Sequence, residues 1–522
     1  MTSTAPLAAA PTATPYWLAA VVGFGAFMEV LDTSIANVSL SHIAGSLAAS
    51  QEEATWVLTS YLVANAIILP MTGWLSNVIG RRRYYIASII LFTLASVLCG
   101  LAPSLPVLIV ARVLQGLAGG ALQPVSQAIL SDAFPQSKRG TAMAIYAMAV
   151  ICGPAIGPPL GGLITDTFSW HWIFLLNAPV GVLLAIAAFR LVHDSPAQLE
   201  AQRLRRTETF TVDYLGFALI VIGMGTLQIM LDKGQQEDWL DSGFIRGCLF
   251  VSVSALLALI VWELRHPHPI VNLRLLKNRN FATSNLLIFF MGMAMFGIIV
   301  LMPQFTQSVL GYSALDAGIV MSPGALLMFC MMPLAARVAT KVEPRALISV
   351  GFVVFGAGLL VTAHFTSLGL AQHQLVLMRM AQVAGIAFLM VPINMLAYVG
   401  LPPSEGGNAS ALLNLMRNLG SGVGISLAVS WLSRGVQMHQ AQLVDRVSLL
   451  DPAYQQTIAT LGRRFDIDTA HAMIAGMVQK QAMVLAYIDD YHYFALLAFL
   501  IAPLIWFAKK PPADAPPPPL VH

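Results

Sequence analysis

Apolar residues fill this chain in blocks of about twenty, with short polar connections between them. A helix rises roughly 1.5 Å per residue, so about twenty apolar residues cross the roughly 30 Å hydrocarbon core of a bilayer. We therefore predict an all-α polytopic membrane protein with fourteen transmembrane helices. Their approximate bounds are 17–39, 55–77, 84–102, 105–129, 141–164, 171–190, 213–232, 245–264, 282–304, 314–337, 346–366, 374–400, 407–432 and 491–508.

Polar and small residues recur 267 positions apart inside these apolar stretches, and no gap is needed to align them. The matched pairs are Arg112 and Arg379, Gln115 and Gln382, Pro135 and Pro402, Gly140 and Gly407, Gly153 and Gly420, and Gly157 and Gly424. A weaker correspondence joins Pro70 and Arg82 to Pro333 and Arg345. The repeated unit is six helices in one orientation, which indicates a pseudo-two-fold axis along the membrane normal and the major facilitator fold.

Two six-helix bundles leave two extra central helices, 213–232 and 245–264, between the repeats. We predict a cytoplasmic N-terminal tail at 1–15, an N-terminal six-helix bundle at 16–190, and cytoplasmic loops with two linker helices at 191–281. The C-terminal six-helix bundle is predicted at 282–432 and 491–508, interrupted by a periplasmic loop at 433–490. A Pro-rich cytoplasmic tail is predicted at 509–522.

Lys and Arg concentrate in alternate connections, as expected of loops that stay in the cytoplasm. These connections contain Arg81, Arg82, Arg83, Lys138, Arg139, Arg190, Arg203, Arg205, Arg206, Arg265, Arg274, Lys277, Arg279, Arg337, Lys341 and Arg345. Because Lys509 and Lys510 follow the last span, both termini are predicted to face the cytoplasm, as an even number of spans requires.

Composition supports the membrane class and limits the other possibilities. The chain is 57% hydrophobic and 10% charged, whereas about a quarter of the residues of a soluble domain are charged. A net charge of +3 is too small to suggest a nucleic-acid partner. The four cysteines lie in apolar stretches, where no disulfide framework is expected, and the scattered histidines predict no metal site. No Lys or Arg precedes Tyr16, so we expect the first span to be retained and not cleaved as a signal peptide.

Two carboxylates of the first span and one nearby guanidinium fall inside apolar stretches, where each costs about 2.5 to 3.5 kcal/mol on insertion scales and requires a partner or a water-filled cavity. Glu29 and Asp32 are three residues apart and share one face of the span 17–39. Asp32 and Arg112 lie at similar depths, roughly 10 Å from the periplasmic ends of their spans. We therefore predict an ion pair between them.

Such a pair has two interpretations. As a proton switch, protonation of Asp32 releases Arg112, and a cationic substrate or water takes its place. As a structural pair, it only holds the two spans together. Two carboxylates near one Arg exceed what structure requires, which favours the switch. Glu29 either takes part directly in coupling, or snorkels into the cavity, or accepts a hydrogen bond from Thr33.

The span 141–164 contains glycines and prolines at close spacing: Gly153, Pro154, Gly157, Pro158, Gly161 and Gly162. Glycines at intervals of four form one flat helix face that a neighbouring helix can approach closely. An interior Pro removes a backbone hydrogen bond and bends the helix. A packing seam would explain the glycines alone, whereas the prolines favour a bend or gating element.

Four motifs resemble those of one transporter family: LDTSIANV from Leu31, GWLSNVIGRRR from Gly73, RVLQGLAGG from Arg112 and GPAIGPPLGG from Gly153. They are similar to motifs of the fourteen-span drug:proton antiporters of the major facilitator superfamily. SWHWIFLLNAPVG, LQIMLDKG and PIVNLRLLKNRNF extend the likeness, so that the chain resembles EmrB-type multidrug efflux permeases from about Trp17 to Phe507.

This resemblance implies a proton-coupled antiporter that exports hydrophobic or amphipathic toxic compounds across the bacterial inner membrane by alternating access. It implies no cofactor except the proton as coupling ion, with Asp32 at the position of the coupling carboxylate and Arg112 as its relay. Such permeases work with a periplasmic adaptor and an outer-membrane channel. The segment 433–490 is the candidate docking surface, and the alternative is a cap over the transport domain.

The conformational loop motif of the family corresponds to Gly73, Asn77, Gly80, Arg81 and Arg82. Asn77 stands where an acidic residue is usual, so the charge network expected on the cytoplasmic side is weakened or rearranged. Glu29 stands where a neutral polar residue is common, so this extra acid would alter the proton stoichiometry or favour cationic substrates.

Asn37, Gln115 and Arg417 are the candidates for substrate contacts in a cavity on the pseudo-two-fold axis. Arg417 lies near the centre of the span 407–432, where it either binds an anionic substrate or is satisfied by neighbouring carbonyls, and the second interpretation is favoured. Arg379 lies close to the outer end of its span and is predicted to snorkel toward the interface.

Two other classes of function stay open at this stage. One is a proton-linked importer or facilitator of a small metabolite, and the other is a membrane receptor or embedded enzyme. The proline-rich span 141–164 and the fourteen-span plan favour efflux over import. The sequence offers no constellation of His, Ser or Cys for covalent chemistry, so an enzyme is not expected.

Overall fold

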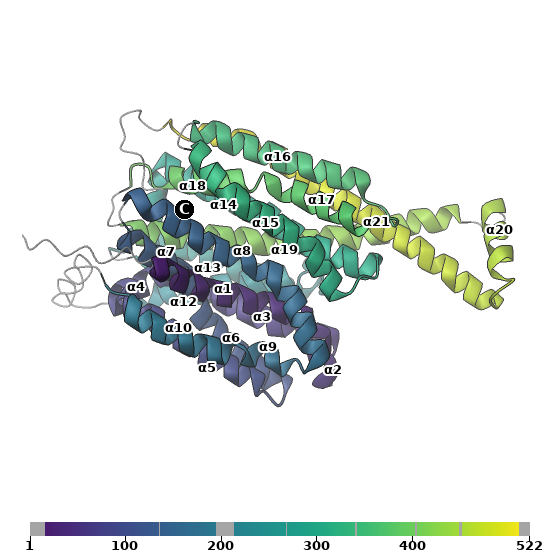
Figure 1. The fold of residues 1–522 in the computed structure, drawn as a ribbon, viewed down its shortest axis with the longest axis horizontal. Helices are drawn as coiled ribbons and strands as arrows, with labels where there is room; N and C mark the ends of the chain where they lie inside the picture. The colour runs from purple at the N-terminus through teal and green to yellow at the C-terminus, as the bar shows by residue number, and fades with distance from the viewer. Residues whose placement is uncertain are drawn as a thin grey trace, which may run out of the picture.

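The structure is a computed structural model that describes residues 16–134, 136–194, 213–267, 269–339, 342–401, 405–447 and 451–510. Within these ranges the chain is helical and contains no strand, which confirms the predicted all-α class. Figure 1 shows two bundles of long helices side by side, purple to blue for the first part of the chain and green to yellow for the last. The predicted tail at 1–15 and residues 511–522 of the Pro-rich tail lie outside the described residues.

The first bundle begins at Tyr16 and ends at Leu191. Its helices are α1 (Tyr16–Val38), α2 (Leu40–Ser46), α3 (Gln51–Ile68), η1 (Leu69–Met71), α4 (Thr72–Ile79), α5 (Arg81–Gly100), α6 (Leu105–Gly119), α7 (Leu122–Ala133), α8 (Gln136–Thr167), α9 (His171–Leu175) and α10 (Asn177–Leu191). The predicted span 105–129 is therefore built from two consecutive helices, α6 and α7.

Helices of this bundle are interrupted where the local sequence removes or replaces helical hydrogen bonds. Pro70 lies in the short η1 segment between α3 and α4, because it has no N–H to donate. Gly80 separates α4 from α5 with a φ of 97°, a conformation that residues with a Cβ rarely adopt. Ser50 begins α3 with a capping box, since its hydroxyl accepts from the Glu53 N–H at 3.1 Å and the Glu53 carboxylate accepts from the Ser50 N–H at 2.8 Å.

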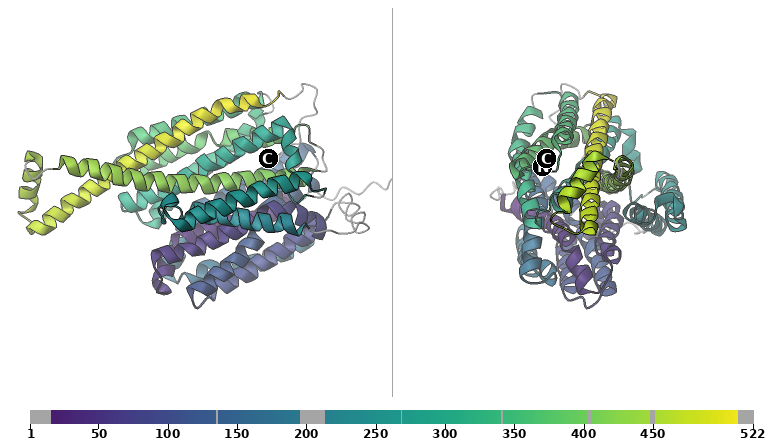
Figure 2. Two further views of the ribbon diagram at one scale, coloured as in Figure 1. Left: turned by 180° about the vertical axis from the view of Figure 1, so that it is seen from behind. Right: turned by 90° about the vertical axis from the view of Figure 1, so that its right-hand side faces the viewer.

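Two helices connect the bundles, and the second bundle follows. The remaining helices are α12 (Tyr214–Lys233), η2 (Trp239–Asp241), α13 (Gly243–Arg265), η3 (Leu273–Lys277), α14 (Arg279–Gln304), η4 (Phe305–Val309), α15 (Ala314–Ala339), α16 (Pro344–Phe365), α17 (Gln372–Ala384), α18 (Ala387–Ala397), α19 (Gly406–Arg446), α20 (Pro452–Leu461), α21 (Ile467–Ile501) and η6 (Ala502–Phe507). In the right-hand view of Figure 2, α12 and α13 pack as a pair on one side of the molecule.

Twelve helices among the described residues are long and apolar enough to cross a membrane. Large apolar side chains such as Phe250 and Leu183 are exposed on their outer faces, where a lipid bilayer would cover them. The two other predicted spans correspond to α8 and α19, which are 32 and 41 residues long. The structure thus shows a polytopic helical membrane protein, and the count of fourteen is not fully confirmed.

The segment 433–490, predicted as a periplasmic loop, is largely helical in its described part. α19 continues to Arg446, α20 follows it, and α21 begins at Ile467, well before the predicted span start at 491. Figures 1 and 2 show α19 and α21 leaving the bundle together with α20 at the far tip. The outer parts of α19 and α21 are polar, as expected of helices in water. A hydropathy pattern therefore ends each predicted span before the helix itself ends.

Local contacts hold this helical extension together. The His439 ring nitrogen Nε2 lies 2.7 Å from Asp489 Oδ2, which joins α19 to α21 near the bundle. Asp466 caps α21, since its carboxylate accepts hydrogen bonds from the N–H and hydroxyl of Thr469. These bonds hold the pKa of the Asp466 carboxyl below its usual value. The entry into α21 is therefore fixed by its own sequence.

The glycines that recur between the halves bring equivalent helices into close contact. In the first half, a Cβ on Gly153 would lie 2.8 Å from Val30 Cγ1, so α8 packs directly against α1. In the second half, a Cβ on Gly420 would overlap the carbonyl oxygen of Phe289, so α19 packs equally closely against α14. The repeat seen in the sequence is therefore a repeated helix seam.

Gly424→Ala is expected to destabilise the second bundle by roughly 1 to 3 kcal/mol, as overpacking of a tight interior does. Its Cβ would overlap the backbone carbonyl oxygen of Met293, which cannot turn away as a side chain can. Gly422→Ala is the matched control on the same helix, because its Cβ would lie 3.3 Å from the Gln228 side chain. Thermal unfolding of the purified variants measures the difference, and equal melting temperatures would contradict the seam.

Candidate functional site

An ion pair lies buried in the first bundle, where α1 faces α6. Arg112 Nη1 donates to Asp32 Oδ2 at 2.6 Å. The exposed fraction is 2% for Asp32 and 0% for Arg112, so the pair is shielded from solvent. The predicted partnership between the two spans is present in the structure.

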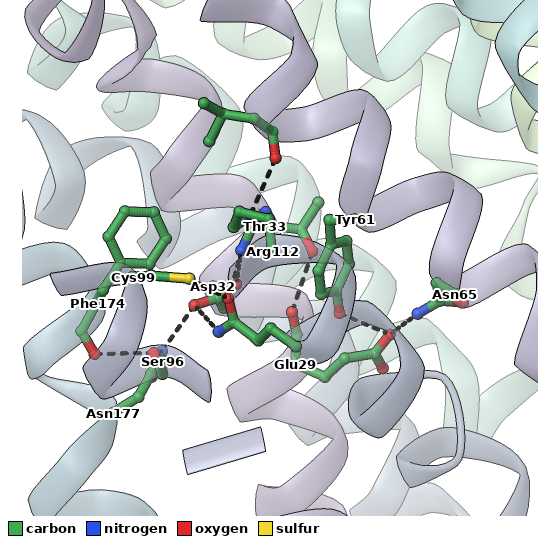
Figure 3. A network of polar contacts seen from close by, with 12 residues as sticks. Glu29, Asp32, Thr33, Tyr61, Asn65, Ser96, Cys99, Arg112, Phe174 and Asn177 are labelled. Atoms are coloured by element: carbon green, nitrogen blue, oxygen red, sulfur yellow. Dashed lines mark hydrogen bonds and ion pairs between the residues drawn. The ribbon is translucent and has the colours of Figure 1, made fainter. Parts of the chain in front are cut away.

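Amide side chains complete the coordination of Asp32, as Figure 3 shows in part. Asp32 Oδ1 accepts from Gln115 Nε2 at 2.9 Å and from Asn177 Nδ2 at 2.7 Å. Asn177 also donates to Ser96 Oγ at 3.0 Å, and Ser96 donates to the Phe174 carbonyl at 2.9 Å. Three helices, α5, α6 and α10, therefore converge on one carboxylate of α1.

Arg112 is held by its backbone and aromatic neighbours as well as by the carboxylate. Its Nε donates to the Val57 carbonyl of α3 at 3.0 Å, and its Nη1 also donates to Gln115 Oε1 at 2.9 Å. The guanidinium carbon lies 4.4 Å from the ring centroid of Tyr61 and 5.4 Å from that of Phe174. Within the described part of the chain, the buried Nη2 has no hydrogen-bond partner.

Glu29 has its own set of partners, and its carboxylate forms no hydrogen bond or ion pair with Arg112. Its Oε1 accepts from Asn65 Nδ2 at 3.0 Å and from the Tyr61 hydroxyl at 3.5 Å, while its Oε2 accepts from Gln123 Nε2 at 2.7 Å. Thr33 donates to the Glu29 backbone carbonyl at 3.2 Å. The hydrogen bond from Thr33 is therefore present, and it reaches the backbone carbonyl one turn earlier and not the carboxylate.

The motif-bearing helix α8 lies along α1, directly behind the two carboxylates. A Cβ on Gly157 would overlap Ser34, and one on Gly161 would lie 3.1 Å from Ile35 Cγ2, so the glycine face contacts α1 along its length. Gly162 is buried beside this face. α8 is one continuous helix, in which Pro154 and Pro158 occupy interior positions while their side chains lie outside the description.

The opposite side of α8 meets the second bundle. A Cβ on Gly318 of α15 would overlap the ring of Pro159, so these helices touch across the boundary between the halves. α8 thus packs against the carboxylate-bearing helix with one face and against the second half with another. This position suits the predicted gating role, which stays a prediction.

The loop motif after α4 is anchored within the first bundle. Arg81 forms an ion pair with Asp132 at the end of α7. The Arg82 backbone N–H donates to Asp194 Oδ1 at 3.0 Å, and its guanidinium donates to the Phe189 carbonyl at 2.7 Å. Gly73 is buried, and Gly80 provides the positive φ between the helices, while the Asn77 side chain is not described. Asp132 of α7 therefore pairs with the Arg81 side chain, and Asp194, three residues after α10, accepts from the Arg82 backbone.

The three predicted cavity residues lie in different surroundings. Gln115 belongs to the Asp32 cluster. Asn37 is exposed near the end of α1, so it does not share the buried polar cluster. Arg417 of α19 donates from Nη2 to Gln123 Oε1 at 3.0 Å and to Asn414 Oδ1 at 2.7 Å. Side-chain amide oxygens satisfy Arg417, in line with the favoured interpretation, and one of them belongs to the first half.

The second half repeats the Arg and Gln of the site without its carboxylate. Arg379 Nη1 donates to Gln382 Oε1 at 3.1 Å, and Gln382 donates to Thr362 Oγ1 at 3.3 Å. Arg379 forms no ion pair with any described residue. It is 7% exposed and lies against Gly324 of α15. The prediction that it snorkels to the interface is wrong, because neighbouring helices enclose its side chain.

Three amides that complete the site were not among the predicted residues: Asn65, Gln123 and Asn177. An uncharged amide in an apolar span is a weaker signal than a charge, since it costs less to bury. Asn177 falls within the stretch SWHWIFLLNAPVG, and Gln123 lies one turn before Gln127 on the same helix. Polar residues that face one another across helices are visible only when the packing is known.

Comparisons with known proteins agree with this architecture. Residues 22–425 match the Major Facilitator Superfamily. The chain is 37% identical over 486 residues to the multidrug export protein EmrB of Escherichia coli K12, covering 93% of each chain. It is 33% identical over 503 residues to the fatty acid resistance protein FarB of Neisseria gonorrhoeae, covering 95% of this chain and 96% of that one.

A solved structure shares the fold. It is a bacterial homologue of the human lysosomal transporter Spinster, in an inward-facing and unoccupied conformation, with a TM-score of 0.58 and 16% identity over 96% of this chain and 100% of that one. The family match spans most of both bundles, and the relatives match along nearly their whole length. The chain therefore belongs to the major facilitator superfamily and, within it, to the EmrB-type multidrug export proteins: it is a transporter and not an enzyme.

Proposed function

We propose that the chain is a proton-coupled antiporter that exports hydrophobic or amphipathic toxic compounds across the bacterial inner membrane by alternating access. The observation that carries this proposal is the Asp32–Arg112 pair, buried and 2.6 Å apart inside a helix bundle. Relatives named for multidrug export, fatty acid resistance and colistin resistance support the substrate class. The proton is the only coupling ion in this proposal.

A proton on Asp32 changes the energy of the whole cluster. The ionised carboxylate compensates the charge of Arg112, and protonation removes that compensation. A buried guanidinium without a counter-ion is strongly unfavourable, since breaking one side of a buried pair costs roughly 3 to 5 kcal/mol. The protonated protein is therefore biased toward a conformation in which Arg112 reaches water. Binding of one proton thus shifts the equilibrium between the conformations of the protein.

The amides around Asp32 suit both protonation states. Gln115 and Asn177 each carry N–H groups that donate to the ionised carboxylate, as they do in this structure. After protonation, departure of Arg112 frees one lone pair of the Gln115 side-chain oxygen, which can then accept from the new O–H of Asp32. Asp32 can therefore take up or release a proton while its carboxyl group keeps hydrogen-bond partners.

A permanently structural ion pair is the alternative. Such a pair is most stable when both terminal nitrogens of the guanidinium bind the carboxylate. Here Nη1 carries the contacts to Asp32 and Gln115, while Nη2 lacks a hydrogen-bond partner among the described residues. This incomplete pairing favours a site that changes partners during transport.

Transport in proteoliposomes with an imposed pH gradient tests the function. A lipophilic fluorescent cation and a fatty acid serve as probes, and the antiporter moves each of them against the direction of proton flow. Collapse of the gradient with an uncoupler is expected to stop net movement. Movement of a probe in the same direction as the protons would indicate an importer instead.

The extension formed by residues 433–490 is proposed as the docking surface for a periplasmic adaptor that connects to an outer-membrane channel, with both termini of the chain in the cytoplasm. It leaves the bundle at the end opposite the C-terminus (Figure 1). Exposed apolar side chains, among them Val444, Phe465 and Met477, lie on it. An adaptor bound there would cover these side chains.

Deletion of residues 440–480, with the two helix stubs joined by a short Gly/Ser linker, is expected to abolish co-purification with the adaptor. The His439–Asp489 contact lies outside the deleted segment, so the bundle should keep its fold. Co-purification of the tagged permease with co-expressed adaptor measures the effect, and size-exclusion chromatography checks the fold. Undiminished recovery of the adaptor would leave the extension as a cap.

A further inference from the structure

Gln123 of α7 is the one described residue that forms hydrogen bonds both with Glu29 and with the second half of the protein. Its Nε2 donates to Glu29 Oε2 at 2.7 Å, and its Oε1 accepts from Arg417 Nη2 at 3.0 Å. Arg417 in turn donates to Asn414 on its own helix at 2.7 Å. A single amide therefore connects a carboxylate of α1 to a guanidinium of α19.

The chemistry of the two neighbours dictates how this amide is oriented. An ionised carboxylate only accepts hydrogen bonds, whereas a guanidinium only donates them. The Gln123 side chain has one donating and one accepting end, so its nitrogen must face Glu29 and its oxygen must face Arg417. Charge on Glu29 thus fixes the orientation that the contact with α19 requires.

Neutralisation of Glu29 removes this constraint. A protonated carboxyl carries an O–H that can donate to the Gln123 oxygen, and the charge-assisted hydrogen bond, about twice as strong as a neutral one, is lost. If the amide turns, its N–H₂ faces the N–H groups of Arg417, and a donor meets a donor. The contact between the halves weakens as a result.

We propose that Gln123 is a positioning residue that transmits the charge state of Glu29 to the contact between the two halves of the transporter. This inference rests on the proposed function and assigns Glu29 a role different from that of Asp32. Asp32 is paired wholly within the first half, so its proton acts on Arg112. Glu29 acts through Gln123 on Arg417, and its ionised form stabilises the arrangement of halves seen here.

Groups on every helix packed around Glu29 are consistent with this role. α3 contributes Tyr61 and Asn65, which hold its other oxygen. Arg417 of α19 acts on it electrostatically, and Tyr146 of α8 lies in the field of both. Apart from Asp32 one turn along α1, no other described carboxylate acts on the cluster. The charge on Glu29 therefore determines the orientation of the Gln123 amide.

A second amide one turn further along α7 offers a matched control. Gln127 Oε1 accepts from Ser410 at 3.3 Å and from Asn414 at 3.4 Å, and its Nε2 donates to the Tyr146 hydroxyl at 3.3 Å. Gln127 therefore contacts the same face of α19 without touching Glu29. Its replacement should weaken the contact between the halves independently of Glu29.

Spin-label distances in lipid nanodiscs measure the arrangement of the halves directly. Ala133 at the end of α7 and Val342 just before α16 are exposed and lie in different halves. Replacing Cys152 and Cys330 by Ser removes the accessible thiols, since Cys99 and Cys248 are buried. In each variant, the fraction of molecules at the label distance of the present structure is compared with the fraction at all other distances.

Gln123→Met and Glu29→Met are each expected to reduce that population about tenfold relative to the others, as loss of a charge-assisted hydrogen bond does. The double variant should show no further reduction, because both changes break one connection. Gln127→Met should add to the effect of Glu29→Met. Additive effects of the Glu29 and Gln123 changes, or no effect of Gln123→Met, would overturn the proposal.

Gln123→Glu provides a second test that does not depend on losing a contact. Its carboxylate would pair with Arg417 whatever the state of Glu29, so Glu29→Met in this background should leave the distances unchanged. If Glu29→Met shifts the distances in this background as much as it does in the natural chain, the proposal is also overturned. Because the distances require no transport, failure of this connection and failure of proton-coupled export in proteoliposomes are separate results.

Discussion

Asp32→Asn is expected to abolish export driven by a proton gradient, with a loss of about a hundredfold, while exchange of substrate across the membrane without net proton movement persists. The amide has nearly the shape of the carboxylate, and its oxygen still accepts from Gln115 and Asn177. It cannot take up or release a proton near neutral pH, so the gradient has no group on which to act. Proton-coupled steps lose their driving force, whereas substrate binding does not depend on it.

The measurement compares two assays in the same proteoliposomes. Gradient-driven uptake reports coupling, and counterflow of labelled substrate at equal pH on both sides reports binding and conformational exchange. Size-exclusion profiles confirm that the variant is folded. Gradient-driven transport at the natural rate would reject Asp32 as the coupling group, and loss of both activities would point to a structural role for the pair.

Arg112→Met is expected to have the largest effect on stability, a loss of roughly 3 to 5 kcal/mol, because it leaves the Asp32 charge buried without its counter-ion. The guanidinium is also stacked against Tyr61 and Phe174, so Met, which is long and apolar, preserves part of that packing. Thermal unfolding of the purified protein at neutral pH measures the loss.

The double variant Asp32→Asn, Arg112→Met is the decisive comparison. Removing both charges leaves neither one unpaired, so most of the lost stability should return. Gradient-driven transport should remain absent, since the coupling carboxylate is gone. If the double variant is as unstable as the sum of the single ones, the two residues do not act as a buried pair, and the assignment of the switch fails.

The sequence predicted those features that depend on a single helix or on charge. The apolar blocks located the spans, and the matched depth of Asp32 and Arg112 led to their pairing, since a buried charge demands a counter-charge. The spacing of Gly153, Gly157 and Gly161 indicated a close seam before the partner helix, α1, was known. In each case one physical requirement left few alternatives.

Features that depend on how helices face one another could not be predicted. Nothing in the pattern around Gln123 shows that it lies between Glu29 and Arg417, since the three positions belong to three helices and two halves. Arg379 was placed at the interface because its depth was known while the helices that enclose it were not. The full length of the helical extension could not be predicted for a related reason, because hydropathy marks the membrane-spanning part of a helix and not the residue at which the helix ends.

The unbroken run of α19 from the bundle into the extension has a mechanical consequence. At 1.5 Å per residue, its 41 residues span roughly 60 Å, and about a third of them lie outside the bundle. Because the helix is continuous, a tilt of about 5° inside the membrane would move the end of this outer part, roughly 20 Å away, by about 2 Å. α20 follows the far end of the helix that carries Arg417. A partner bound at that end would therefore be displaced if the second bundle tilts during transport.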